Sequence, residues 1–116
     1  MDTWTAIEQL KNLRNDWNSY GAQPPDDAML AKTREYLTAV TNTLGHAYSQ
    51  PAVQPLADPG IALIWRDRWR PDEVEILVTR TGAEWILLRD HRIVKHGSAS
   101  DPAVFDREVL KLHVSL

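Results

Sequence analysis

The chain has 116 residues, of which 43% are hydrophobic and 25% charged, and its formal net charge is −3. This length predicts a single domain over residues 1–116 that can bury a core without metal ions or disulfides. With no cysteine there is no disulfide, thiolate nucleophile or cysteine-ligated zinc site. Residues 1–50 carry four basic and six acidic side chains and residues 51–116 carry nine and ten, so neither half is built to bind nucleic acid by bulk positive charge.

No segment has the features of a signal peptide or of a membrane span. The stretch Met1–Thr5 lacks the basic and apolar regions of a secretory signal. The longest apolar run, Ile61–Trp65, is far shorter than the roughly 20 residues that a membrane-spanning helix needs. We therefore expect a soluble, cytoplasmic protein that has no membrane partner.

Two amphipathic helices are predicted in the N-terminal half. The first covers Thr3–Trp17, where the apolar side chains follow the helical period and Trp4 lies at the margin of their stripe. The second covers Asp27–Leu44. Acidic residues stand at its start, where they meet the positive end of the helix dipole, and Gly45 follows its end as a residue that tolerates the left-handed conformation.

Extended segments follow the second helix. A short edge strand is predicted over Ala52–Gln54, because flanking prolines cannot donate hydrogen bonds within a sheet. Alternation of apolar and polar residues then predicts an antiparallel meander with turns at residues 81–83 and 90–91. Its four strands are Ile61–Arg66, Glu73–Arg80, Glu84–Arg89 and Arg92–His96.

A third helix is predicted after Asp101-Pro102, which supply an N-cap and a proline at the first helical position. The predicted fold class is therefore α+β. It has two N-terminal helices, an antiparallel meander sheet of three to five strands, and one C-terminal helix packed on one face.

No group of residues predicts catalysis or metal binding. Asp90, His91 and His96 come nearest to an acid–base or metal cluster, but a strand of roughly 15 Å would separate the two histidines. The serines lack the neighbouring base that activates a nucleophile. We therefore expect no catalytic residue, no metal and no cofactor, and an enzyme with a site near Asp90 remains the least favoured alternative.

The segment Trp65–Asp72 is the strongest candidate for a contact site. Three arginines and two aspartates surround Trp69, and tryptophan and arginine dominate binding hot spots. The side chain of Trp69 either folds back over the sheet or projects into solvent. Beyond the hairpin, Glu73 and Glu75 share one face of a strand, which is either a solvated face or part of a docking surface. The predicted partner-binding residues are Arg66, Arg68, Trp69, Arg70, Glu73 and Glu75.

The sequence resembles a family of small uncharacterised bacterial and phage proteins. The resemblance rests on three segments: Trp17-Asn18-Ser19-Tyr20-Gly21-Ala22 followed by Pro24-Pro25, then Pro51-Ala52-Val53-Gln54-Pro55, and then Pro59-Gly60-Ile61-Ala62-Leu63-Ile64-Trp65. The family has a W-D-G-Y-G-A-type corner and a D-G-x-I-x-L-x-W strand, so this chain departs from it at residues 18, 19 and 59. The resemblance implies a setting in phages or other mobile elements and supplies no catalytic residue.

These observations lead to one main functional hypothesis. We expect a non-enzymatic protein-binding accessory protein encoded by a phage or mobile element. It would inhibit a host defence complex, in the manner of an anti-CRISPR protein, or act as an immunity or antitoxin type of partner. The alternative is nucleic-acid binding through the arginines and Trp69, because arginine beside an aromatic ring stacks on unpaired bases. A homodimer formed through a sheet edge is compatible with either hypothesis.

Overall fold

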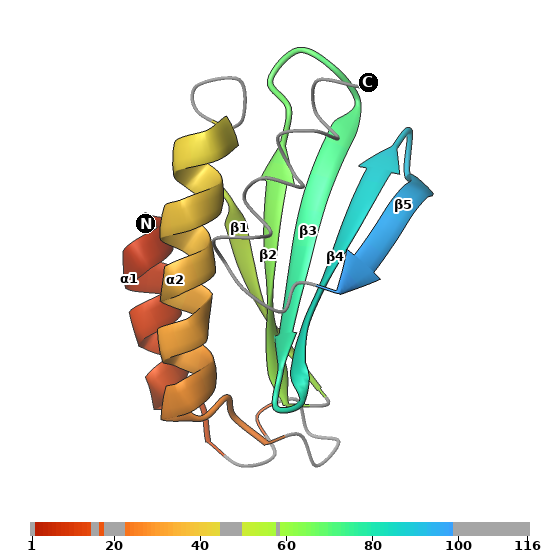
Figure 1. Cartoon of the computed structure of the whole chain (residues 1–116). Coiled ribbons are helices and arrows are strands. Elements are labelled where there is room, and N and C mark those ends of the chain that lie inside the picture. The colour runs from red at the N-terminus through yellow and green to blue at the C-terminus, as the bar shows by residue number, and fades with distance from the viewer. Residues whose placement is uncertain (1, 15–16, 18–22, 45–49, 58, 99–116) are drawn as a thin grey trace.

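The computed structural model of the chain describes residues 2–14, 17, 23–44, 50–57 and 59–98 (Figure 1). Two helices, α1 (Thr3–Gln9) and α2 (Asp27–Leu44), lie side by side against one face of a five-stranded antiparallel sheet. The α+β class with an antiparallel sheet is therefore confirmed. No helix in this described part is long and apolar enough to cross a membrane.

The sheet is a meander in which each strand pairs with the next one along the chain. Its strands are β1 (Ala52–Leu56), β2 (Gly60–Arg66), β3 (Asp72–Thr79), β4 (Gly82–Arg89) and β5 (Arg92–Ser98). The position of β1 at the edge follows from Pro55, which pairs with Ile61 and has no N–H for a further neighbour. The predicted edge strand is thereby confirmed.

The turns between the last three strands differ in chemistry. Asp90 and His91 connect β4 to β5 as predicted, and their φ angles of 52° and 64° are those of a type I′ turn. The connection from β3 to β4 is one residue earlier than predicted. The turn consists of Arg80 and Thr81. Thr79 pairs with Gly82, so β4 begins at the glycine that was predicted to lie in the turn.

The first helix is shorter than predicted. The α-helix ends at Gln9, a 3₁₀ turn follows over Leu10–Asn12, and Leu13 is extended with ψ of 139°. Leu10 and Leu13 nevertheless pack against the core, so the apolar spacing that predicted a longer helix is satisfied by a different backbone. The predicted third helix lies outside the described residues.

The core lies between the helices and one face of the sheet. The alternation in β3 places Val74, Ile76 and Val78 on the helix side, as predicted. Trp65 is 1% exposed and joins the same face of β2. The opposite face of the sheet, which we call the open face because neither α1 nor α2 covers it, carries Glu73 and Glu75 together with buried Ala62 and Ile64 and half-buried apolar side chains. The fold therefore places the predicted hairpin at one end of the sheet, where β2 meets β3.

Candidate functional site

The connection between β2 and β3 (residues 67–71) and the strand ends beside it are together called the Arg/Trp hairpin, residues 65–72. The backbone N–H of Asp67 donates to the Asp72 carbonyl oxygen at 2.9 Å and closes the base of the loop. Residues 68–71 form the loop beyond this bond. The loop therefore stands at the end of two strands whose registers are fixed by the buried core.

Asp67 shapes the loop from within. Its side chain is only 2% exposed, and its Oδ1 accepts hydrogen bonds from the backbone N–H groups of Trp69 at 2.8 Å and Arg70 at 3.1 Å. Short acidic side chains stabilise turns in this way. Burial opposes ionisation of Asp67, but these two bonds and the Arg70 guanidinium outweigh it, so the pKa of Asp67 lies below its ordinary value.

Asp72 connects the hairpin to the rest of the sheet. Its side chain is 1% exposed and accepts from the guanidinium of Arg89, with Nε 2.9 Å from Oδ1 and Nη2 3.4 Å from Oδ2. Arg70 Nε lies 3.7 Å from the same carboxylate. The backbone N–H of Asp90 donates to the Pro71 carbonyl oxygen at 3.0 Å, so the β4–β5 turn supports the loop from the side.

Trp69 is the most exposed large apolar side chain of the hairpin, with 76% of its surface accessible. The structure thereby decides between the two predicted positions, because the indole projects into solvent instead of folding over the sheet. Arg66, Arg68 and Arg70 are also exposed. The hairpin therefore brings together the indole and the three predicted arginines.

The two predicted glutamates lie apart from Trp69, on the open face. Glu73 accepts from Arg66 Nε at 3.3 Å, which places one hairpin arginine on this face as well. Glu75 lies between Ile64 and Ile86 in the strand register. Burial and repulsion from Glu73 raise the pKa of Glu75, against the opposing attraction of Arg66. Glu75 is therefore a half-buried member of a mixed surface instead of a fully solvated charge.

His91 and His96, the two histidines that the structure describes, do not gather into a site. Asp90 and His91 form the β4–β5 turn, whereas His96 pairs with Ile86 within the strands. Within the described ranges, no three His, Asp or Glu side chains lie close enough together to hold a metal ion.

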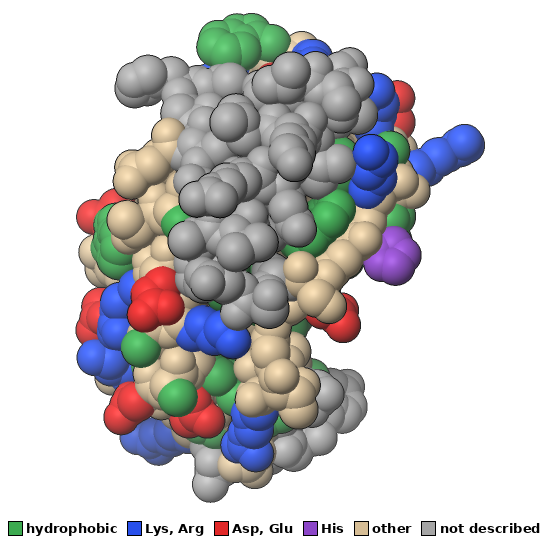
Figure 2. Space-filling view, viewed as in Figure 1, with side chains coloured by type: hydrophobic (Ala, Val, Ile, Leu, Met, Phe, Trp, Pro, Cys, Tyr) green, Lys and Arg blue, Asp and Glu red, His purple; other side chains and the backbone are tan. Residues whose placement is uncertain are grey.

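Charges on the helical side of the molecule are mixed. Acidic and basic side chains alternate there over α2 in the space-filling view (Figure 2). Glu8 pairs with both Lys11 and Arg34, and Arg80 lies 3.9 Å from Asp26. The described residues of this face therefore form no field of a single sign of the kind that attracts a nucleic-acid backbone.

The sequence predicted Trp69 and its arginines as candidate contact residues, but it did not predict the residues that hold the loop in place. Asp67, two positions before Trp69, has the spacing of an aspartate that bonds to the backbone of its own turn, and this signal was available in the sequence. The role of Arg89 was not, because it depends on the pairing of β3 with β4. Comparison of the chain with known protein families, with characterised proteins and with solved structures gives no match.

Proposed function

We propose that this protein is a non-enzymatic protein-binding module whose contact site is the Arg/Trp hairpin, with Trp69 as its central contact. The observation that carries the proposal is the 76% exposure of an indole at the tip of a loop whose two aspartates are buried. Large aromatic side chains dominate binding energies when they enter a pocket on a partner.

The order of the loop supports this role. Binding costs free energy when loops and side chains must become ordered at the interface. In the Arg/Trp hairpin, the Asp67 carboxylate already accepts from the backbone N–H groups of Trp69 and Arg70. The Asp72 carboxylate binds the Arg89 side chain and so anchors the other end of the loop to β4. A partner therefore meets a preorganised loop, and little of the interaction energy is lost to ordering it.

The charge pattern favours a protein over nucleic acid. Arg66 pairs with Glu73, and Arg70 pairs with both Asp67 and Asp72. These local pairs reduce the positive field that would release counter-ions from a phosphate backbone. A protein surface with an apolar pocket and a rim of both charges complements such a hairpin better. Inhibition of a host defence complex, or an immunity or antitoxin type of pairing, is the biological role that the resemblance at residues 17–22 favours.

The proposal is tested by quantitative affinity capture from the native host with three baits. These are the wild-type chain, Trp69→Ala, and Ile93→Ala as a control at another exposed apolar residue, which is 60% accessible on β5. We expect one protein partner to be retained by the wild type and by Ile93→Ala. Its affinity for Trp69→Ala, measured with the purified partner, should fall by about 2–4 kcal/mol.

Two results would contradict the proposal. Retention of every partner by Trp69→Ala, with unchanged affinity, would show that the hairpin is not the contact site. Capture of DNA or RNA with an affinity that falls steeply as salt is added would show that the partner is a nucleic acid and not a protein. Thermal unfolding of Trp69→Ala provides the folding control, since a side chain this exposed should change stability by no more than about 0.5 kcal/mol.

A further inference from the structure

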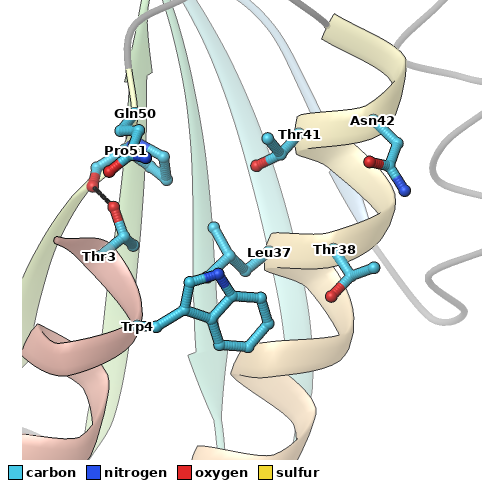
Figure 3. A pocket seen from close by; sticks show the side chains of 8 residues that line it. All are labelled: Thr3, Trp4, Leu37, Thr38, Thr41, Asn42, Gln50 and Pro51. Carbon is cyan, nitrogen blue, oxygen red and sulfur yellow. Dashed lines mark hydrogen bonds between the residues drawn. The ribbon is translucent and has the colours of Figure 1, made fainter.

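A pocket of about 160 Å³ lies between α1, the C-terminal part of α2 and the residues that lead into β1 (Figure 3). The indole of Trp4 projects from α1 toward α2 across one side of the pocket, and Leu37 of α2 belongs to the same lining. Pro51 adds a second ring on the β1 side, and the amide side chains of Asn42 and Gln50 belong to the same lining. None of these residues takes part in the Arg/Trp hairpin.

Hydrogen bonds hold the walls of the pocket in place. The buried hydroxyl of Thr3 donates to the Pro51 carbonyl oxygen at 2.9 Å and ties α1 to the start of β1. Trp65 Nε1 donates to Thr41 Oγ1 at 3.3 Å and ties α2 to the core face of β2. Contacts between distant parts of the chain therefore hold the pocket together.

The size and charge of the pocket restrict what it can bind. Its volume is close to that of the roughly 150 Å³ apolar cavity known to hold a single benzene ring. Cofactors and drug-sized molecules occupy about 300–1,000 Å³. Among the residues that the structure describes, the lining includes no Asp, Glu, Lys, Arg or His. The pocket therefore suits one uncharged ring or side chain and is too small for a nucleotide.

The lining offers hydrogen-bond donors beside a flat aromatic face. Trp4 is 47% exposed and carries an indole N–H, and Asn42 and Gln50 carry amide N–H₂ groups. The hydroxyl of Thr38 already donates to the Arg34 carbonyl oxygen at 3.1 Å. An aromatic surface with several donors complements a polyproline II segment, whose rings are apolar and whose carbonyl oxygens have no internal partners.

We propose that this pocket binds a proline ring presented by an extended, proline-rich segment of a protein partner. The ring stacks on Trp4 against Leu37, and the flanking carbonyl oxygens of the peptide accept from the donors at the rim. The inference rests on the proposed protein-binding function, but it concerns a second surface that does not include Trp69. Because a polyproline II segment is preorganised, it loses little conformational entropy on docking.

Selection of short random peptides on the immobilised full chain tests the inference. We expect proline to be enriched at one position of the selected peptides. The affinity of the best peptide should fall at least about tenfold in Trp4→Ala, and less in Trp4→Phe, which keeps an aromatic face but has no N–H. Thr38→Lys is a second variant at an exposed helical position, and its charged chain should block the pocket to a similar extent.

Trp69→Ala is the matched control, since it removes an exposed indole from the other surface, and the selected peptide should bind it as tightly as it binds the wild type. Selection without proline enrichment would overturn the inference, and so would equal affinity of the peptide for the wild type, Trp4→Ala and Thr38→Lys. If Trp69→Ala abolishes capture of a partner while no peptide binds, only this inference fails. If the peptide binds as expected while Trp69→Ala retains every partner, only the hairpin proposal fails.

Discussion

Asp72 and Arg89 face each other across β3 and β4, and the guanidinium of Arg89 donates to both oxygens of a carboxylate that is 1% exposed. The pair lies directly below the loop that carries Trp69. It fixes the end of the sheet at which the β2–β3 and β4–β5 connections meet through the bond from Asp90 to Pro71. The loop that carries the exposed indole is thus anchored on an ion pair between the buried Asp72 carboxylate and the partly exposed Arg89 side chain of the adjacent strand.

Replacing the Asp72 carboxylate by an amide should destabilise the protein. Asp72→Asn keeps the shape of the side chain but removes the charge that Arg89 and Arg70 contact. Because hydrogen bonds to charged groups contribute about 1.5–3 kcal/mol, we expect the free energy of unfolding in urea to fall by about that amount. The loss should lie toward the lower end of this range, because the Arg89 side chain is 40% exposed and is rehydrated in the variant.

Asp90→Asn is the control for this substitution. It removes a carboxylate from the neighbouring turn, where the side chain is exposed and where asparagine accepts the same positive φ. We expect its unfolding free energy to match that of the wild type. An equal loss of unfolding free energy in both variants would assign the effect to the net charge at this end of the sheet and not to the pair of Asp72 and Arg89.

Asp67 should make part of the stability depend on acidic pH. Its pKa in the folded protein lies below the ordinary value of 3.8, since the bonds to the Trp69 and Arg70 N–H groups and to the Arg70 guanidinium outweigh the effect of burial. Its contribution is therefore complete above that value and is lost as the pH falls through the folded-state pKa. Between about pH 6 and pH 2, the wild type should lose more unfolding free energy than Asp67→Asn does.

The measurement is a series of urea unfolding curves at constant ionic strength. Asp67→Asn should be less stable than the wild type at neutral pH, and the two should converge in acid. Parallel curves over the whole range would mean that Asp67 is equally solvated in the folded and unfolded chains, in disagreement with its 2% exposed side chain.

The meander of strands was predictable because its signals are local. The alternation of Val74, Ile76 and Val78 identifies a half-buried strand, and the prolines beside residues 52–54 identify an edge. The length of α1 was not predictable from spacing alone. Leu10 and Leu13 have helical spacing, but both reach the core from a 3₁₀ turn and an extended residue, and only the tertiary packing decides between these backbones.

The candidate sites were predictable to different degrees. Trp69 and its arginines can be picked out as a candidate site from the sequence, because they cluster within a few residues. The exposure of Trp69 cannot be predicted in this way, since the loop is held by Asp67 and by the pairing of Asp72 with Arg89 on the neighbouring strand. The pocket at Trp4 was missed altogether. Its walls come from residues up to 48 positions apart, such as Thr3 and Pro51, and no pattern along the chain brings them together.

Glu75 should destabilise the folded chain at neutral pH. Burial and the nearby Glu73 raise its pKa above the ordinary value of 4.5. A group with a raised folded-state pKa contributes its stability below the unfolded value, and that contribution is lost as the pH rises through the folded-state pKa. Glu75→Gln should therefore unfold at a higher temperature than the wild type at pH 7, and the difference should disappear below about pH 4.5.

Glu84→Gln is the matched control, because Glu84 lies on the same open face of the sheet but is exposed. We expect this variant to follow the wild type at every pH. A higher unfolding temperature in both variants would assign the effect to the overall negative charge of the chain. A lower unfolding temperature of Glu75→Gln at pH 7 would mean that attraction by Arg66 outweighs burial and Glu73.

Gly97 lies opposite an indole ring that leaves no room for a side chain at this position. It pairs with Trp85, and a Cβ at this position would lie 2.9 Å from Trp85 Nε1 and 3.1 Å from both Cε2 and Cζ2. Trp85 is 8% exposed and belongs to the core, so its ring has little freedom to move aside. We expect Gly97→Ala to lower the free energy of unfolding by about 1–3 kcal/mol, the usual effect of overpacking.

A double-mutant cycle separates this contact from the general effect of alanine in a strand. Trp85→Leu alone should be destabilising, because it removes core volume. In the Trp85→Leu background the alanine at position 97 has room, so its additional cost should fall below about 0.5 kcal/mol. Urea unfolding of the four proteins provides the measurement. Strict additivity of the two substitutions would show that the indole does not limit the side chain at position 97.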